Sequence, residues 1–156
     1  ESKFTQNLYD TARSNPKRVV FAEGTHPTML EAAVRAKEEG ICFPILFGND
    51  VQIRKIAEEL KLNLEGIEIL NLRNDTQNER RHRYAQIFAK KMERKGYTPQ
   101  EAEDKMYERN YFGMMMVETG EADAFITGLY YTIRHHCRSI IGSCDDLFFV
   151  LGIAHY

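Results

Sequence analysis

The chain has 156 residues, of which 21 are basic and 23 acidic, so its net charge is −2. This length fits one domain with its own core. Hydrophobic residues make up 43% and charged residues 28%, proportions that exclude a disordered chain. The charge balance gives no indication of nucleic acid or an anionic membrane as a partner. No apolar run is long enough to cross a bilayer, and we expect no signal peptide. The three cysteines, Cys42, Cys137 and Cys144, fit reduced thiols. We therefore predict a cytoplasmic protein.

The first sixteen residues predict a short amphipathic helix, which would act as a docking helix or as the end of a linker. Phe4, Leu8 and Ala12 are spaced so that they share one helical face. Pro16 disfavours helix in the residue before it, so the helix should end there. We therefore assign residues 1–16 to an N-terminal helix or linker and residues 17–156 to one α/β domain.

From residue 17 onward, short apolar runs alternate with helical patterns. We expect strands at 17–22, 42–47 and 66–70, separated by helices at 25–40 and 51–60. Strands and helices in this order form right-handed crossovers, which predict a mainly parallel sheet with helices on both faces, a three-layer αβα fold. Pro44 cannot donate a ladder hydrogen bond, so its strand should lie at a sheet edge or begin late.

Two further helices interrupt this alternation and predict a helical hairpin inserted on the flank of the fold. The first spans 74–95, and the second opens on the capping box Thr98-Pro99-Gln100-Glu101 and ends near Glu108. The remaining expected elements are a helix at 111–119 capped by Asn110, a strand at 122–127, a helix at 132–141 and a strand at 147–151.

Four blocks of sequence, in this order and spacing, resemble the phosphate acetyltransferase/butyryltransferase family. They are NPKRVVFAEG at 15–24, RYAQIFAKKMERKGYTPQEA at 83–102, NYFGMMMVETGEADAFITG at 110–128 and TIR at 132–134. The resemblance covers roughly residues 12–142, and the first and third blocks are most similar to the phosphotransacetylase-like C-terminal module of bacterial NADP-dependent malic enzymes.

The resemblance implies a two-lobed α/β module with the active cleft between its lobes. Family members move an acetyl group between coenzyme A and phosphate, and in malic enzymes the module is thought to sense acetyl-CoA and related metabolites and to support oligomerisation. The second lobe and the family's Ser-Arg and Asp catalytic positions have no match in this sequence, and the loop between Gly128 and Thr132 is shorter than the family pattern. We therefore expect an incomplete module that does not turn over substrate alone.

Cofactors and partners follow from the same resemblance. We expect this segment to bind no cofactor of its own and to take acetyl-CoA, coenzyme A, acetyl phosphate or phosphate as its ligand. NADP and a divalent metal would belong to a malate-oxidising domain, which this sequence does not contain. A homo-oligomer is expected, without nucleic acid or membrane as a partner.

The ligand site is predicted where the strand at 122–127 ends in a glycine-bearing loop before a helix. Free backbone N–H groups and the helix dipole favour an anion at such a place. Arg134 lies in the first turn of that helix, and a guanidinium matches phosphate or carboxylate. The resemblance makes Arg134 a phosphate or coenzyme A contact, with Thr132, Thr127 and Gly128 beside it. The alternative is an ordinary surface arginine.

Glu23 and Gly24 follow the first strand, at the end of a parallel sheet where ligands bind. Gly24 would be needed for a positive φ or for close approach of the backbone. Glu23 would orient Arg134 or another group in the cleft. The alternative, a plain turn between strand and helix, is the more common use of such a pair.

Three other patterns indicate structure rather than chemistry. His135 and His136 are adjacent and point in different directions from a helix, so with Cys137 they form a poor metal site, and we predict none. Met114, Met115 and Met116 fit core packing. The basic residues of 80–95 fit a solvated face or a subunit contact better than RNA.

Three hypotheses remain for the function. The first is a regulatory, ligand-binding module of a malic enzyme, and the second is a fragment of an active phosphate acetyltransferase. The third is a purely structural assembly domain, which exposed apolar residues such as Phe88 and Met92 on the inserted helices would favour.

Overall fold

The computed structural model describes residues 2–127. In this part of the chain, four parallel strands form one sheet: β1 (Lys17–Phe21), β2 (Cys42–Phe47), β3 (Glu68–Leu70) and β4 (Ala124–Ile126). The strand order is β3-β2-β1-β4, so the chain moves outward from β1 to β3 and returns to the other side of β1 as β4. The parallel sheet is confirmed, and its order reverses between β1 and β4.

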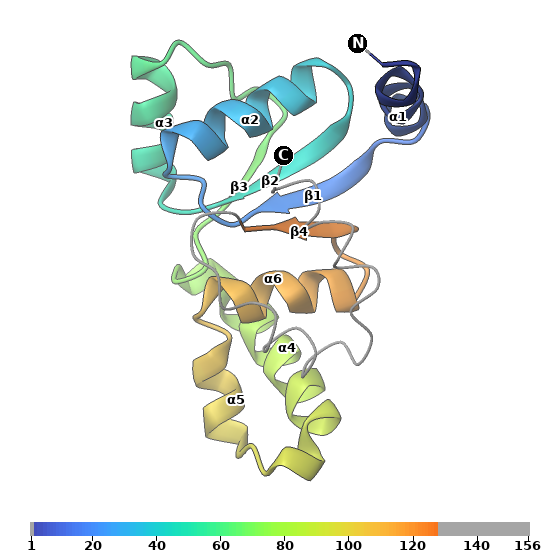
Figure 1. The fold of residues 1–156 in the computed structure, drawn as a ribbon. Coiled ribbons are helices and arrows are strands. Elements are labelled where there is room, and N and C mark those ends of the chain that lie inside the picture. Colours follow the sequence, from blue (N-terminus) through green and yellow to red (C-terminus); the bar gives the residue numbers. More distant parts are fainter. Residues whose placement is uncertain (1, 128–156) are drawn as a thin grey trace.

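Helices cover both faces of the sheet and confirm the three-layer αβα prediction. Figure 1 shows α2 (Pro27–Glu38) and α3 (Asp50–Glu59) on one face and α6 (Arg109–Glu118) on the other. Alternate residues of each strand enter two different apolar clusters: Val20 and Ile45 pack towards α6, whereas Phe21 and Leu46 pack towards α2 and α3. Within residues 2–127, no helix has the length and hydropathy of a membrane span.

The N-terminal helix is present as α1 (Lys3–Ser14), which confirms that prediction. None of its residues is buried, and Phe4 and Leu8 of its apolar face are exposed. Arg13 donates a hydrogen bond of 2.9 Å from Nε to the carbonyl oxygen of Glu39, at the end of α2.

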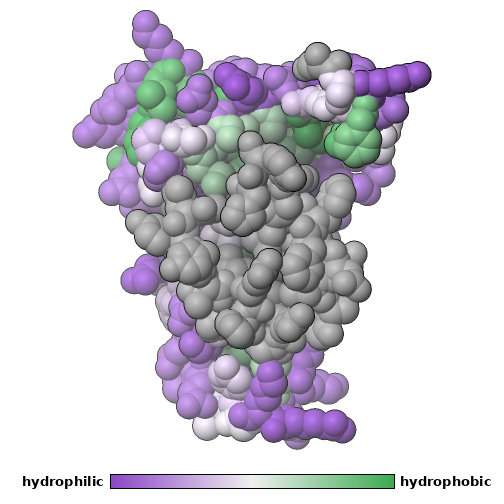
Figure 2. Space-filling view, viewed as in Figure 1, coloured by the Kyte–Doolittle hydropathy of each residue, from purple (hydrophilic) through white to green (hydrophobic). Residues whose placement is uncertain are grey.

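The predicted helical hairpin is formed by α4 (Asn78–Lys91) and α5 (Pro99–Lys105). The single helix expected at 74–95 is divided into the 3₁₀ turn η1 (Asp75–Gln77), α4 and the 3₁₀ turn η2 (Glu93–Lys95). Thr98 and Glu101 form the predicted capping box at the start of α5, with bonds of 2.8 and 3.1 Å between side chains and backbone N–H groups. Hydrophilic residues dominate the end of the molecule that α4 and α5 form (Figure 2).

Exposed apolar residues on the hairpin, which would favour an assembly domain, are not found at Phe88 or Met92. Phe88 is 1% exposed and Met92 is 4% exposed. The Phe88 ring packs edge-on against Tyr97 and Tyr111, with centroid distances of 5.1 and 5.7 Å. α4 therefore buries its narrow apolar stripe inside the chain, between α5 and α6. These two residues do not provide the exposed apolar surface that would favour an assembly domain.

The start of α6 and the position of β2 in the sheet differ from the predictions. α6 begins at Arg109 with Glu108 as its N-cap, so Asn110 lies inside the first turn and is not the cap. β2 begins at Cys42 and lies inside the sheet, not at its edge. Gly48 N donates towards β3, to Leu70 O, so by alternation Pro44 also faces β3. β3 pairs with β2 only from Ile45 onward, and the missing N–H of Pro44 therefore leaves no ladder bond unmade.

Candidate functional site

An open cavity of about 670 Å³ lies at the carboxyl ends of β1, β2 and β3, beside the start of α6. Its lining residues are Ala22, Glu23, Thr25, Phe47, Gly48, Asn49, Asn71, Leu72, Arg73, Tyr107, Glu108, Arg109 and Asn110. The volume is typical of a small-molecule site. In open α/β sheets, ligands bind outside the carboxyl ends of the strands, close to the point at which the strand order reverses.

Glu23 links the ends of β1 and β4 at this reversal. It is only 6% exposed, and its Oε1 accepts a hydrogen bond of 2.5 Å from Thr127 Oγ1. The Nη2 of Arg109, at the start of α6, lies 3.7 Å from the same oxygen. The other oxygen, Oε2, is buried and has no hydrogen-bond partner among the described residues. An unsatisfied buried acceptor costs about 1–3 kcal/mol, so a donor group of a ligand would bind favourably here.

Asn110 presents a second acceptor of this kind. Its Oδ1 is buried and has no hydrogen-bond partner within residues 2–127. Because Glu23 and Asn110 line the same cavity, two unsatisfied acceptors lie around one volume. A ligand that carries O–H, N–H or S–H donors would satisfy them.

Gly24 is required by close approach of the backbone rather than by a positive φ. Its N–H donates 2.9 Å to the carbonyl oxygen of Phe47, at the end of β2. A Cβ at this position would lie 2.6 Å from that oxygen. Any larger residue would therefore push the turn that carries Glu23 away from β2. A structural requirement accounts for Gly24, and its contact with a ligand stays a prediction.

Two arginines supply positive charge to the cavity. Arg73 follows β3, where its backbone N–H bonds to Asn71 Oδ1 at 3.3 Å, and Arg109 is the first residue of α6. The N-cap Glu108 makes no side-chain capping bond, which leaves the first N–H groups of α6 without that partner. Guanidinium groups and a helix N-terminus together favour phosphate or carboxylate.

Neither arginine is predicted as a site residue from the sequence. Arg73 lies in a loop and Arg109 at a helix boundary, and their proximity depends on how β3 and α6 pack. One local signal was available for Arg109: a cation at a helix N-terminus opposes the helix dipole and therefore needs a compensating partner. Glu23 is that partner.

The structure brings together some of the predicted site residues. Glu23 and Thr127 are hydrogen-bonded to each other, and Gly24 adjoins them. Gly128, Thr132 and Arg134 lie outside the described residues. So do His135, His136 and Cys137, the residues considered above as a metal site. Within the described part of the chain, no cluster of three metal-ligating side chains occurs.

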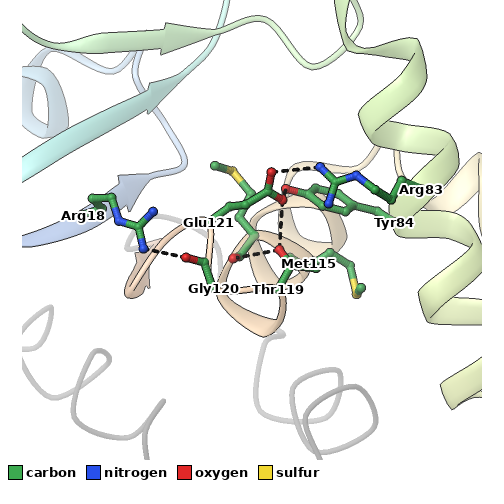
Figure 3. A network of polar contacts seen from close by, with 8 residues as sticks. Arg18, Arg83, Tyr84, Met115, Thr119, Gly120 and Glu121 are labelled. Atoms are coloured by element: carbon green, nitrogen blue, oxygen red, sulfur yellow. Dashed lines mark hydrogen bonds and ion pairs between the residues drawn. The ribbon is translucent and has the colours of Figure 1, made fainter.

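A second polar network lies at the opposite, amino end of the strands (Figure 3). The carboxylate of Glu121 accepts hydrogen bonds from Arg83 Nη2 at 2.8 Å, from Thr119 Oγ1 at 3.0 Å and from the Tyr84 hydroxyl. Burial alone would raise the pKa of Glu121, but these three bonds outweigh it and lower the pKa to about 2. Burial, together with the bond to Glu121, raises the pKa of Tyr84. The network joins α4 to the turn before β4 and lies away from the cavity, so we assign it to stability.

Comparisons with known proteins agree with the predicted resemblance. Residues 3–146 match the family described as phosphate acetyl/butaryl transferase. A phosphate acetyltransferase of Thermoanaerobacterium thermosaccharolyticum is 35% identical over 123 residues, which cover 79% of this chain and 36% of that protein. One of Corynebacterium glutamicum is 33% identical over 132 residues, or 85% of this chain and 39% of that protein.

A malic enzyme is similar to the same extent. The NADP-dependent malic enzyme of Rhizobium meliloti is 32% identical over 127 residues, which cover 80% of this chain and 16% of the enzyme. The chain thus spans well under half the length of these relatives. Both kinds of protein match at nearly equal identity. The comparisons therefore support the family and do not decide whether the chain belongs to a phosphate acetyltransferase or to a malic enzyme.

Solved structures share the fold. The EutD phosphotransacetylase of Staphylococcus aureus matches with a TM-score of 0.73 and 24% identity over 87% of this chain and 41% of that one. A phosphotransacetylase of Streptococcus pyogenes matches with a TM-score of 0.75 and 22% identity over 91% of this chain and 41% of that one. At these identities, the likeness supports the α/β architecture alone.

Proposed function

Because the chain belongs to the phosphate acetyl/butyryl transferase family, we propose that its cavity binds an anionic ligand of that chemistry: acetyl-CoA, coenzyme A, acetyl phosphate or phosphate. The observation that supports this most directly is the position of Arg73, Arg109 and the N-terminus of α6 around one cavity at the carboxyl edge of the sheet. Glu23 lines the cavity at the β1–β4 reversal, and Thr127 holds Glu23 through a hydrogen bond. Thr132 and Arg134 add ligand contacts.

In the parent protein, this domain is the regulatory, phosphotransacetylase-like module of a cytoplasmic bacterial NADP-dependent malic enzyme. There it responds to acetyl-CoA or a phosphate metabolite and supports a homo-oligomer. The similarity to the malic enzyme of Rhizobium meliloti supports this setting. In this proposal, NADP and a divalent metal act on malate in another part of the parent protein.

A second candidate is a part of an active phosphate acetyltransferase, which the similarity to two such enzymes supports. In that reaction, the thiolate of coenzyme A attacks the acetyl carbonyl of acetyl phosphate. A C–S bond forms, the bond from carbon to the phosphate oxygen breaks, and phosphate leaves. Cationic side chains stabilise the negative charge that develops on the carbonyl and phosphate oxygens. Arg134, Arg109 and Arg73 are the residues to which we assign this role.

Calorimetric titration of the chain with coenzyme A, acetyl phosphate and inorganic phosphate tests the shared claim. We expect Arg109→Met and Arg73→Met each to weaken binding at least about tenfold, the usual cost of losing a charge-assisted bond. Arg35→Met is the matched control, because Arg35 is exposed in the last turn of α2, at the opposite end of the strands. Failure of the unmodified chain to bind any of the three compounds, or equal weakening by Arg35→Met, contradicts the proposal.

Arg134→Ala tests the residue that the resemblance assigns. Loss of its guanidinium should also weaken coenzyme A binding about tenfold or more. Unchanged affinity in the calorimeter would remove Arg134 from the site and leave the ligand to the cavity residues.

Activity of the parent protein separates the two settings. A malic enzyme reduces NADP with malate, and addition of acetyl-CoA should change that rate. A phosphate acetyltransferase forms acetyl-CoA from acetyl phosphate and coenzyme A without malate. Acetyl-CoA formation at an enzymatic rate, without any malate oxidation, would overturn the first setting in favour of the second.

A further inference from the structure

Arg81 of α4 is a charged residue buried outside the cavity lining, with only 2% of its surface exposed. Its Nη1 donates to the carbonyl oxygens of Leu72 and, at 3.0 Å, Asn74, and its Nη2 donates to Asn78 Oδ1. Its guanidinium carbon lies 4.4 Å from the centroid of the Tyr107 ring. These partners within residues 2–127 are carbonyl oxygens, an amide and a ring face, and none is a carboxylate.

The partners of Arg81 lie on both sides of the two cavity arginines. Leu72 and Asn74, whose carbonyl oxygens it binds, immediately precede and follow Arg73. Tyr107, whose ring it faces, comes two residues before Arg109. Leu72, Tyr107 and both arginines line the cavity. One guanidinium therefore joins the loop after β3 to the segment before α6, the two segments that carry the positive charge of the site.

We propose that Arg81 is a positioning residue, which holds Arg73 and Arg109 at the separation that an anionic ligand requires. This inference rests on the proposed function of the cavity. Arg81 itself is covered by protein, so it acts through the two segments that it joins. Its charge has no carboxylate partner among the described residues, and it therefore adds to the positive potential beside the cavity.

Only an arginine can make this set of contacts. Its planar fork donates to several acceptors at once while one face stacks on a ring. A lysine at the same place keeps the charge but offers a point donor without the fork or the flat face. Arg81→Lys therefore separates positioning from charge, and Arg81→Met removes both.

Coenzyme A affinity, measured by calorimetry, gives the first test. We expect both Arg81→Lys and Arg81→Met to weaken binding at least about tenfold. Tyr107→Leu removes the stacking partner, leaves Arg81 in place and should weaken binding by a smaller factor. It still provides a test if the Arg81 variants do not fold. Phe88→Leu is the control for general destabilisation, because Phe88 is equally buried in α4 but packs against Tyr97 and Tyr111. It should lower the unfolding temperature without changing the affinity.

Full affinity in Arg81→Lys would overturn the positioning role, because charge alone would then suffice. Equal weakening by Phe88→Leu would overturn it as well, because loss of stability alone would then explain the effect. If the unmodified chain does not bind coenzyme A, the proposed function fails. Hydrogen exchange of the backbone amides then still tests whether Arg81 holds the two segments in place. Amides of residues 71–74 and 107–110 should exchange at least about tenfold faster in both Arg81 variants and not in Phe88→Leu. Unchanged exchange in those segments contradicts the proposal.

Discussion

Gly24 shows how one backbone position sets the geometry of the site. The turn after β1 lies so close to the end of β2 that Gly24 N–H and Phe47 O are hydrogen-bonded. Glu23, the adjacent residue, is thereby held beside Thr127 and Arg109. The carboxylate at the β1–β4 reversal thus owes its position to the absence of a side chain at the next residue.

Gly24→Ala should destabilise the chain, because its Cβ would lie 2.6 Å from Phe47 O, a backbone atom that cannot move away alone. We expect a loss of about 1–3 kcal/mol in the free energy of unfolding, as for other overpacked positions, and weaker coenzyme A binding. Urea denaturation measures the first effect. Thr25→Ala, at the exposed next residue, is the control and should change stability by less than about 0.5 kcal/mol. Equal stability of Gly24→Ala and the unmodified chain would contradict the close packing of this turn.

Glu121 makes the stability dependent on pH. Three hydrogen bonds lower its pKa in the folded chain from 4.5 to about 2. A lowered folded pKa means that ionised Glu121 stabilises the chain above pH 4.5 and that this stabilisation is lost as the pH falls towards 2. The difference in unfolding free energy between the unmodified chain and Glu121→Gln should therefore shrink across that window. Denaturant titrations at several pH values measure it, and Arg83→Met should reproduce the effect. A difference that is the same at both ends of the window would contradict the assignment.

At the scale of elements, α6 holds the layers together. Residues Tyr111, Phe112, Gly113, Met114, Met115 and Met116 are all buried, because the sheet covers one side of the helix and α4 covers another. Gly113 lies against the Phe125 ring of β4, where a Cβ would come within 2.3 Å of the ring. Glycine is a poor helix former, so its use here reflects the close approach of helix and sheet.

Gly113→Ala should destabilise the chain although alanine favours the helix. We expect a loss of about 1–3 kcal/mol from overpacking against Phe125. Phe125→Ala alone should cost about 3–5 kcal/mol because it leaves a cavity. The double variant should lose clearly less than the sum, since each change relieves the other. Denaturant unfolding of the three variants tests this, and strict additivity would show that the Gly113–Phe125 contact is not tight.

The sequence predicted elements well where local chemistry decides them. Thr98 and Glu101 mark the start of α5 because a capping box satisfies its own backbone groups. Asn110 was misassigned as a cap, since several polar residues precede the apolar run and local pattern does not rank them. Phe88 belongs to a narrow apolar stripe that the sequence predicts, but the sequence does not reveal whether other elements cover it, as α5 and α6 do. Arg81 was counted with the solvated basic residues for the same reason.

The candidate site was only partly predictable, for a physical reason. Glu23 and Thr127 are predicted as site residues because Glu23 follows a strand and Thr127 ends one, and parallel strands end at one edge of the sheet. Arg73 and Arg109 enter the cavity through the packing of a loop and a helix that are distant in sequence. Their proximity depends on tertiary contacts such as those of Arg81, which no periodicity in the sequence encodes.

At the scale of the whole molecule, the strand order β3-β2-β1-β4 explains where the charged residues gather. Beside this reversal, the carboxyl ends of the strands lie near the start of α6 (Figure 1). Residues from these strand ends and from the start of α6 line the cavity. The stabilising network of Glu121 lies at the other end of the strands. The cavity and the Glu121 network are therefore separated along the strand direction. Substitutions in the Glu121 network should leave ligand binding unchanged, and substitutions of the cavity arginines should leave the stability contributed by that network unchanged.

An NMR titration of the isotope-labelled chain with coenzyme A tests most directly whether the cavity is the ligand site, because backbone amide shifts report where the ligand lies. We predict that the largest changes fall in residues 22–25, 47–49, 71–73 and 107–110, the four segments that line the cavity. The amides of Thr119, Gly120 and Glu121 should change little. Saturable shifts centred on that amino-end network, or no saturable shifts in the four segments, would contradict the claim that this cavity is the ligand site.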